Sequence, residues 1–91
     1  NIIVRTSDSH SIINLNTNDR INHARNVVIG KHVWIAPQSI IMKGAIIGDG
    51  TIVGSRTLVT KTVPENCLAV GAPAKVVKTN VSWSREDIIF K

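Results

Sequence analysis

Residues 29–64 read IGKHVWIAPQSIIMKGAIIGDGTIVGSRTLVTKTVP, and an aliphatic side chain returns at every sixth position of this stretch. The recurring residues are Ile29, Ile35, Ile41, Ile47, Val53 and Val59. A compact residue stands four positions after each of them: Val33, Ser39, Ala45, Thr51, Thr57 and Val63. A period of six fits neither a helix nor a single strand, so it indicates a repeating unit of one short strand and one corner.

Three such units close one coil, so the stretch predicts an all-β fold, a parallel β-helix whose aliphatic side chains fill the interior. The corners, where the backbone must turn sharply, are expected at Lys31-His32, Pro37-Gln38, Lys43-Gly44, Asp49-Gly50, Ser55-Arg56 and Lys61-Thr62. We expect the six-residue spacing to continue without a break to Pro64, which cannot donate to a further rung. Residues 70–75 are then expected to close the coil.

The segment before this stretch departs from the period. Residues 1–13 are predicted to form one or two extended rungs, with Ile12 and Ile13 apolar. Residues 14–27 are polar and are predicted to form a loop that leaves the coil, a kind of segment that often carries function.

The C-terminal residues also change character. Ser84 followed by Asp87 matches a capping box, which predicts a short C-terminal helix. The expected organisation is therefore a β-helix domain over residues 1–78, with upstream coils missing from its start, and a tail over residues 79–91.

The chain carries a net charge of +5 and one cysteine, Cys67. A lone cysteine excludes an internal disulfide framework and a cysteine zinc cluster, and we expect it to be buried in the closing loop. The positive charge suits an anionic small ligand or an acidic polysaccharide. Two Trp, one Phe and no Tyr are too few stacking aromatics for nucleic acid. No apolar stretch has membrane-spanning length, so we expect a soluble protein of the cytoplasm.

Stacked coils place side chains from successive turns in columns along the coil axis. Trp34 precedes an inward aliphatic, so alternation directs it outward, where it needs a neighbouring subunit or a ligand. A long, thin ligand with amides and phosphates, such as pantetheine with its nucleotide diphosphate, fits such a column. Lys61, Lys75 and Lys78 would lie near its phosphate end, where cations are needed.

His10 is the candidate catalytic residue, in the segment Asp8-Ser9-His10-Ser11 just before the polar loop. A neutral imidazole takes a proton from a hydroxyl at physiological pH, and Asp8 would set its tautomer. From the spacing alone, an ordinary surface histidine remains the alternative.

Four motifs occur in order: Val33-Trp34-Ile35-Ala36, Ile47-Gly48-Asp49-Gly50, Val59-Thr60-Lys61 and Gly71-Ala72-Pro73-Ala74-Lys75. Over residues 5–78 the chain resembles the hexapeptide-repeat acyltransferase superfamily, and within it the maltose/galactoside and polysaccharide O-acetyltransferases. The resemblance implies a left-handed parallel β-helix, although parallel crossovers are otherwise right-handed. It also implies a homotrimer that binds acetyl-CoA in the cleft between neighbouring subunits, without a metal.

The resemblance further implies roles for individual residues. His10 would be the general base, and the acceptor hydroxyl would attack the thioester carbonyl directly. The implied coenzyme A contacts are Ser55 through its backbone, Thr60, Lys61, Lys75 and Lys78, with Trp34 beside the pantetheine. The chain departs from relatives at Pro37, where a small polar residue is common, and at the two C-terminal lysines, which replace arginines of some members. The acceptor-binding candidates are Asn14, Arg20, Asn22 and His23 in the loop.

The resulting prediction is an acetyl-CoA-dependent O-acetyltransferase that acts on a sugar hydroxyl in the synthesis of polysaccharides or surface glycans. A non-catalytic or truncated β-helix trimer remains open as an alternative, as does a basic module that binds acidic glycans. A third alternative is a zinc hydratase resembling γ-class carbonic anhydrase, with His10, His23 and His32 as ligands. Their spacings do not reproduce the close histidine pair of that family.

Overall fold

The computed structural model describes residues 1–86 of the chain, and these residues form three sheets of short strands and no helix. The strands are β1 (Ile3–Val4), β2 (Val28–Ile29), β3 (Trp34–Ile35), β4 (Ile40–Ile41), β5 (Ile46–Ile47), β6 (Ile52–Val53), β7 (Leu58–Val59), β8 (Thr62–Val63), β9 (Leu68–Val70) and β10 (Lys75–Lys78). Within residues 1–86, no helix is long and apolar enough to cross a membrane.

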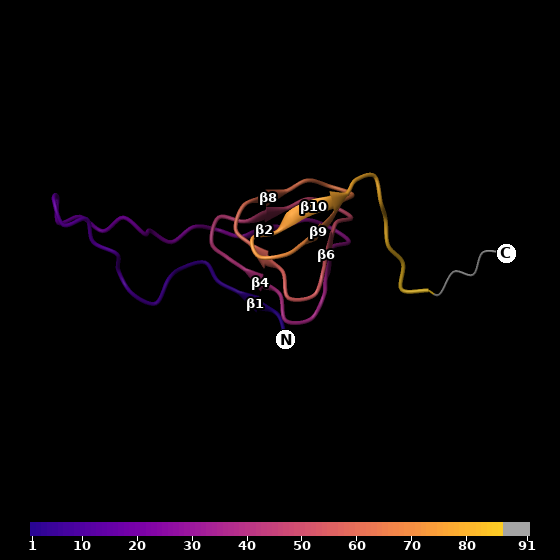
Figure 1. The fold of residues 1–91 in the computed structure, drawn as a ribbon, viewed down its shortest axis with the longest axis horizontal. Coiled ribbons are helices and arrows are strands. Elements are labelled where there is room, and N and C mark those ends of the chain that lie inside the picture. Colours follow the sequence, from indigo (N-terminus) through magenta and orange to yellow (C-terminus); the bar gives the residue numbers. More distant parts are fainter. Residues whose placement is uncertain (87–91) are drawn as a thin grey trace.

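From β1 to β9, consecutive strands belong to different sheets, so the chain winds around a common axis (Figure 1). The sheets have the orders β1-β4-β7, β2-β5-β8 and β10-β9-β6-β3, and every pair is parallel except β9 with β10. Each sheet is therefore built from every third strand of the chain, and β10 is added antiparallel at the edge of the sheet that contains β9. The all-β coil that the six-residue period predicts is confirmed.

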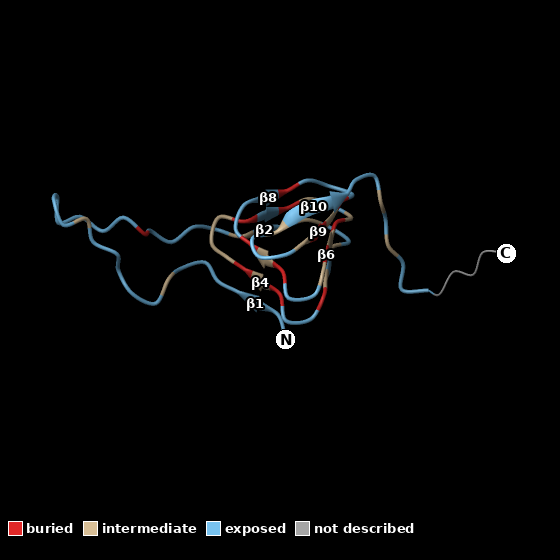
Figure 2. Ribbon diagram, viewed as in Figure 1, coloured by how far each residue is buried: buried red, intermediate tan, exposed pale blue. Residues whose placement is uncertain are grey.

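The interior of the coil contains most of the residues that the repeat singles out, but Ile29, in the first turn, is 40% exposed. The aliphatic side chains of Ile41, Ile47, Val53 and Val59 are at most 1% exposed, and Ser39, Ala45, Thr51 and Thr57 are equally buried. The buried hydroxyls have backbone partners, for example Ser39 Oγ, which donates to the Gly54 carbonyl at 2.9 Å. Figure 2 shows that burial is concentrated in the coil, while residues 6–27 and 79–86 are largely exposed.

Five of the six predicted corners lie where the sequence places them, whereas the predicted corner at Lys61-Thr62 is wrong because Thr62 belongs to β8. The second residue of each of the first five predicted pairs has a positive φ: His32, Gln38, Gly44, Gly50 and Arg56. At Gly44 and Gly50 the φ values are +79° and +72°, in the left-handed region that glycine adopts without a steric penalty. The five corners share this conformation, so each turns the chain in the same sense into the next sheet.

The six-residue spacing does not continue to Pro64, and that prediction was wrong. Ile41 pairs with Val59, 18 residues on, but Ile47 pairs with Val63, only 16 residues on. Between β7 and β8 the corner consists of Thr60 and Lys61 alone. Val63 is compact and aliphatic, so it fills the inward strand position itself and the coil closes with two residues fewer.

The upper end of the coil is closed as predicted by the segment after β9. The Leu58 amide donates to the Gly71 carbonyl at 3.0 Å, and the Ala74 amide donates to the Leu58 carbonyl at 2.9 Å. β10 then runs back antiparallel to β9. Cys67 is buried, as expected, although it lies in the core of the coil rather than in the closing loop.

The tail folds back onto the outside of the coil through Trp83. Its indole stacks on the His32 imidazole with ring centroids 4.0 Å apart, and its Nε1–H donates to the His32 carbonyl at 2.8 Å. The predicted C-terminal helix does not occur in residues 79–86. Its remaining part, including Asp87, lies outside the described residues.

Residues 6–27, here called the arm, leave the coil after β1 and return at β2, to the left in Figure 1. The two halves of the arm run antiparallel, since Ile21 N donates to Ile12 O at 2.9 Å and Ile13 bridges to Arg20. The segment that leaves the coil therefore begins at residue 6, and not at residue 14 as the sequence predicts. The prediction of a rung at Ile12-Ile13 was wrong, because an apolar pair in an antiparallel arm has the same local sequence pattern as a rung.

Alternation on β5 gives a direct test of the coil interior. Ile47→Ala removes a side chain that is 1% exposed and should lower the free energy of unfolding by about 2–5 kcal/mol. Ile46→Ala is the matched control, because this neighbour is 45% exposed and should cost less than about 1 kcal/mol. Denaturant unfolding of the two variants measures the difference. Equal losses would contradict the assignment of inward and outward positions.

Candidate active site

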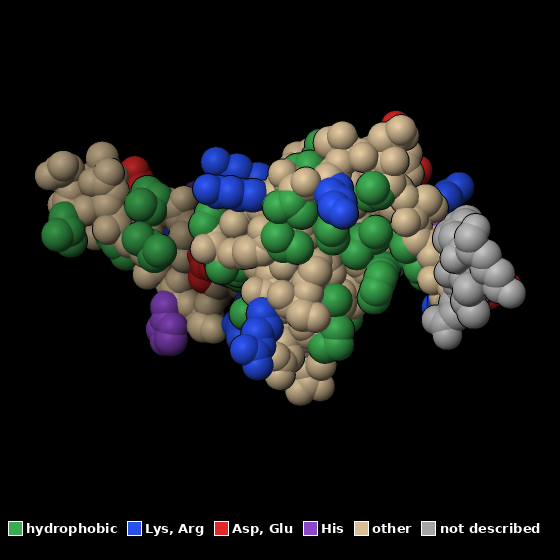
Figure 3. Space-filling model, turned by 45° about the vertical axis from the view of Figure 1, so that its right-hand side comes forward, with side chains coloured by type: hydrophobic (Ala, Val, Ile, Leu, Met, Phe, Trp, Pro, Cys, Tyr) green, Lys and Arg blue, Asp and Glu red, His purple; other side chains and the backbone are tan. Residues whose placement is uncertain are grey.

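One corner of the coil gathers several of the predicted residues. Between the sheet of β1 and the sheet of β2 the chain crosses three times, as the arm, as residues 42–45 and as residues 60–61. The arm, Lys43 and Lys61 therefore occur at the same corner on successive turns. Figure 3 shows Lys and Arg side chains gathered where the arm meets the coil, and hydrophobic side chains along the arm.

An ion pair joins the base of the arm to this corner. Lys43 Nζ lies 2.7 Å from Asp8 Oδ2, and both side chains are partly exposed. The side-chain Nδ2 of Asn22 donates to the same carboxylate oxygen at 2.8 Å. The hydrogen bond from Lys43 is the main cause that lowers the pKa of the Asp8 carboxyl below its ordinary value, and the hydrogen bond from Asn22 is the second. Asp8 is therefore a stable anion at neutral pH.

Asn22 is the buried polar residue of the arm, with 8% of its surface exposed. Its Nδ2 also donates to the His10 carbonyl at 2.7 Å, and its Oδ1 accepts from the Ile12 amide at 2.6 Å and from Arg20 Nε at 3.2 Å. The sequence suggests Asn22 as an acceptor-binding residue, but the structure uses its whole carboxamide inside the arm. No local pattern in the sequence indicates this arrangement.

His10, the candidate base, is exposed on the arm. Among the described residues, the hydrogen bonds of Asp8 go to Lys43 and Asn22 and not to the His10 ring. The backbone of His10 is fixed by Asn22, whereas its imidazole faces solvent. The arrangement leaves the ring accessible to a hydroxyl-bearing molecule.

The remaining acceptor candidates lie at two places along the arm. Arg20 binds Asn22, and His23 lines a hollow of about 290 Å³ together with Ile21, Arg25 and Lys43. Asn14 lies in the turn at the tip, where its Oδ1 accepts from the amides of Asn16 and Thr17. His23 thus lies toward the base of the arm, whereas Arg20 lies next to the tip turn that Asn14 shapes.

Three of the predicted coenzyme A residues line one hollow. Thr60, Lys61 and Lys75 border a cavity of about 290 Å³ between the short corner and the closing segment, with Pro73 on its wall. Ser55 lies at the next exposed corner, after β6, and Lys78 ends β10. Lys61 and Lys75, which are 14 positions apart in the chain, therefore border the same hollow.

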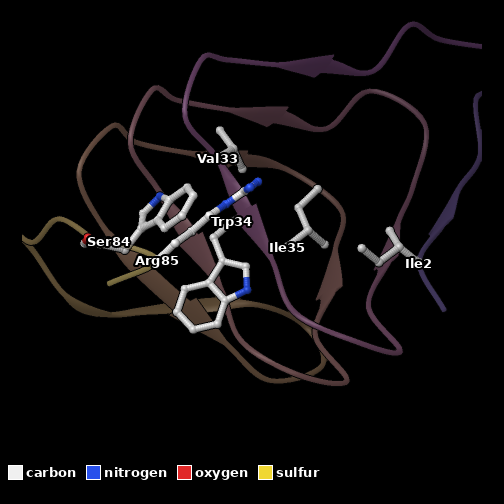
Figure 4. A pocket seen from close by; sticks show the side chains of 7 residues that line it. Ile2, Val33, Trp34, Ile35, Ser84 and Arg85 are labelled. Carbon is white, nitrogen blue, oxygen red and sulfur yellow. The ribbon is translucent and has the colours of Figure 1, made fainter. Parts of the chain in front are cut away.

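Trp34 points outward from β3, as predicted, and is 48% exposed. It borders a cavity of about 650 Å³ whose lining residues are Ile2, Val33, Trp34, Ile35, Trp83, Ser84 and Arg85. Figure 4 shows Trp34 and Arg85 on one side of this cavity and Ile2 on the other. The Trp34 and Trp83 rings are 5.9 Å apart and tilted by 48°. A tail residue thus shares the surface of Trp34, a contact across 49 residues of sequence that no local pattern indicates.

The three histidines occupy different surroundings. His10 and His23 lie on the arm, whereas the His32 ring is stacked on Trp83, with Nε2 3.2 Å from the Trp83 carbonyl oxygen. Within residues 1–86 of this chain, no three His, Cys, Asp or Glu side chains cluster as metal ligands. The Cys67 thiol donates to the Glu65 carbonyl at 3.2 Å.

The ion pair between Lys43 and Asp8 predicts a pH dependence. A carboxyl whose pKa is lowered on folding adds stability above its unfolded pKa, and this contribution is lost as the pH falls through the lower folded value. We therefore expect Lys43→Met to raise the pKa of Asp8 and to destabilise the arm at neutral pH, with the difference shrinking as the pH falls below about 4 and vanishing below the lowered pKa of the folded state. NMR titration of the Asp8 carboxyl carbon measures the change, and Lys31→Met is the control. A titration unaltered by Lys43→Met would refute the pairing.

Known proteins match this chain over the coil and over most of its length. The family model for the bacterial transferase hexapeptide (six repeats) matches residues 26–61, from the end of the arm to the corner after β7. A polysialic acid O-acetyltransferase from Escherichia coli O1:K1 / APEC is 46% identical over 86 residues, 94% of this chain and 28% of the relative. The crystal structure of the polysialic acid O-acetyltransferase OatWY superposes with a TM-score of 0.92 at 40% identity, over 96% of this chain and 42% of that one.

A galactoside acetyltransferase in complex with coenzyme A also shares the fold, with a TM-score of 0.73 and 27% identity over 88% of this chain and 40% of that one. The chain thus spans between about a quarter and two fifths of the length of these relatives. The repeat, the coil of three sheets and the match that extends over the arm agree with one another. On this evidence the chain belongs to the hexapeptide-repeat acetyltransferase superfamily.

Proposed function

We propose that the chain is the catalytic part of an O-acetyltransferase that transfers an acetyl group from acetyl-CoA to a sugar hydroxyl of an acidic glycan in polysaccharide synthesis. The observation that carries this proposal is the match to a polysialic acid O-acetyltransferase, which covers both the coil and the arm. Polysialic acid carries a carboxylate on each sugar, and the net charge of +5 suits such a polyanion. We take polysialic acid or a similar acidic glycan as the acceptor.

In the proposed reaction His10 is the general base. Its exposed imidazole removes the proton from the acceptor hydroxyl, whose oxygen attacks the carbonyl carbon of the thioester. The tetrahedral intermediate collapses to the sugar acetate ester, and the proton returns from His10 to the departing thiolate of coenzyme A. Backbone N–H groups would stabilise the oxyanion. The family role of a histidine and the fixed backbone of His10 support this assignment.

We assign the coenzyme A path to the exposed residues of the coil. Thr60, Lys61 and Lys75 border a common hollow, and two lysines there suit the phosphates. Ser55 and Lys78 extend the path, and Trp34 would lie beside the pantetheine. The galactoside acetyltransferase that shares this fold was solved with coenzyme A, which supports the same cosubstrate class here. Because acetyl-CoA is a metabolite of the cell interior, we place the reaction in the cytoplasm.

The assembly we propose is a homotrimer of left-handed coils, with each active site in a cleft between two subunits. The hollows on a single chain are shallow surface features. The large apolar side chain of Trp34 is exposed beside one of them, and that of Leu15 is exposed at the tip of the arm. A neighbouring subunit would cover these side chains and deepen the cleft. In this cleft Arg20, His23 and Asn14 of the arm would contact the glycan.

The test of the proposed function is an assay of coenzyme A release with acetyl-CoA and polysialic acid, together with the mass of the protein in solution. We expect transfer, and His10→Ala should lower kcat by about 10²–10⁴-fold while leaving the affinity for acetyl-CoA unchanged, because only the proton acceptor is lost. Calorimetry measures the affinity. Loss of both transfer and binding in His10→Ala would refute the assignment of the base, and wild-type protein that binds but never transfers would support a non-catalytic role.

Lys61 provides the corresponding test of the cosubstrate path. An exposed lysine–phosphate contact contributes about 1 kcal/mol, so Lys61→Ala should weaken acetyl-CoA binding by about five-fold at low salt. The effect should shrink as salt rises, because screening weakens the contact in the wild type. Lys31→Ala is the matched control, since Lys31 lies at a different exposed corner of the coil. Unchanged affinity of Lys61→Ala at low salt would contradict the proposed path.

A further inference from the structure

The arm is joined to the coil by few polar contacts. Among the hydrogen bonds and ion pairs of the described residues, the Lys43–Asp8 pair alone joins residues 7–25 to the coil. Two strands by themselves are marginally stable in water. His10, the candidate base on this arm, therefore needs contacts that fix its position relative to the coil.

The Asn22 side chain connects this ion pair to His10. Its carboxamide binds the opposite segment of the arm at every second residue: the carboxylate of Asp8, the carbonyl of His10 and the amide of Ile12. Both hydrogens of Nδ2 donate, and Oδ1 accepts twice, the second time from Arg20. A carboxamide has donors and an acceptor in one plane, so neither an aspartate nor an aliphatic side chain of similar size reproduces this set.

The burial of Asn22 makes these bonds difficult to replace. With 8% of the residue exposed, water has little access to partners left unsatisfied by a substitution. The contact to His10 is made through the main chain, so the imidazole stays accessible while its attachment point is held. Lys43, Asp8 and Asn22 thus form a continuous connection from a corner of the coil to the backbone of His10.

We propose that Asn22 is a positioning residue for His10, and that Asp8 acts in the same connection as the link to Lys43. This inference rests on the proposed function, in which His10 is the general base. Asn22 does not touch the acceptor in this view. Its role is to hold the His10 main chain at a fixed distance from the coil, where the thioester would lie. A displacement of about 1 Å at a reacting group is enough to lower a rate by about 10²-fold.

The experiment compares Asn22→Ala and Asn22→Asp with the wild type in steady-state transfer from acetyl-CoA to polysialic acid. Both variants should lower kcat by about 10–100-fold while the KM values for acetyl-CoA and for the glycan stay within about two-fold. Asn16→Ala is the matched control, an exposed asparagine at the tip of the same arm, and should leave kcat unchanged. Variants with wild-type kcat would overturn the inference. A raised KM for the glycan at constant kcat would also overturn it, and would make Asn22 an acceptor contact.

Hydrogen exchange separates this inference from the proposed function. The Ile12 amide, which donates to Asn22 Oδ1, should be protected in the wild type and should exchange faster in Asn22→Ala. If wild-type protein transfers no acetyl group while Ile12 still depends on Asn22, the proposed function fails, and the positioning role fails with it although the contact stands. If the wild type is active and Ile12 exchanges equally in both proteins, the positioning role alone is wrong.

Discussion

Hydrogen bonds between successive turns of the coil hold this structure together, because no strand is long enough to be stable alone. The strands are two to four residues long, and each of β1 to β9 pairs with a strand one full turn away. A rung can donate and accept along its backbone only if the turn above it has the matching register. The sequence satisfies this condition by repeating an inward aliphatic residue and a compact residue in each of the three sheets. The functional side chains therefore occupy places that the backbone ladder determines.

The candidate site depends on this ladder in two ways. The hollow of Thr60, Lys61 and Lys75 forms because the closing segment hydrogen-bonds back to Leu58 and brings the two lysine-bearing segments together. The arm depends on the ladder more indirectly, since the ladder holds the corner at Lys43 that Asp8 contacts. The ion pair between Lys43 of the coil and Asp8 of the arm thus orients the arm, which buries few side chains of its own.

The coil could be predicted from the sequence in detail, because a period of six constrains every turn. The inward residues around Ile47 and the corners at His32 and Gln38 follow from it directly. The shortened turn after Val59 could not be predicted, since Val63 is equally suitable for the strand and for the compact position that follows a strand. The start of the arm was misplaced for a similar reason, because Ile12 and Ile13 are apolar in either setting. Contacts such as Asp8 with Lys43 and Trp83 with His32 join segments without a shared period, so only the folded chain reveals them.

The corner between the sheet of β1 and the sheet of β2 accepts connections of very different length. It is made by residues 6–27 on one turn, by residues 42–45 on the next and by residues 60–61 on the last, yet the strands on both sides stay paired. The length of the connection at this corner therefore does not affect the pairing of the strands. Under the proposed function, the arm can be lengthened or replaced here without altering the coil to which we assign the acyl donor. The same coil would in this way serve acceptors of different size.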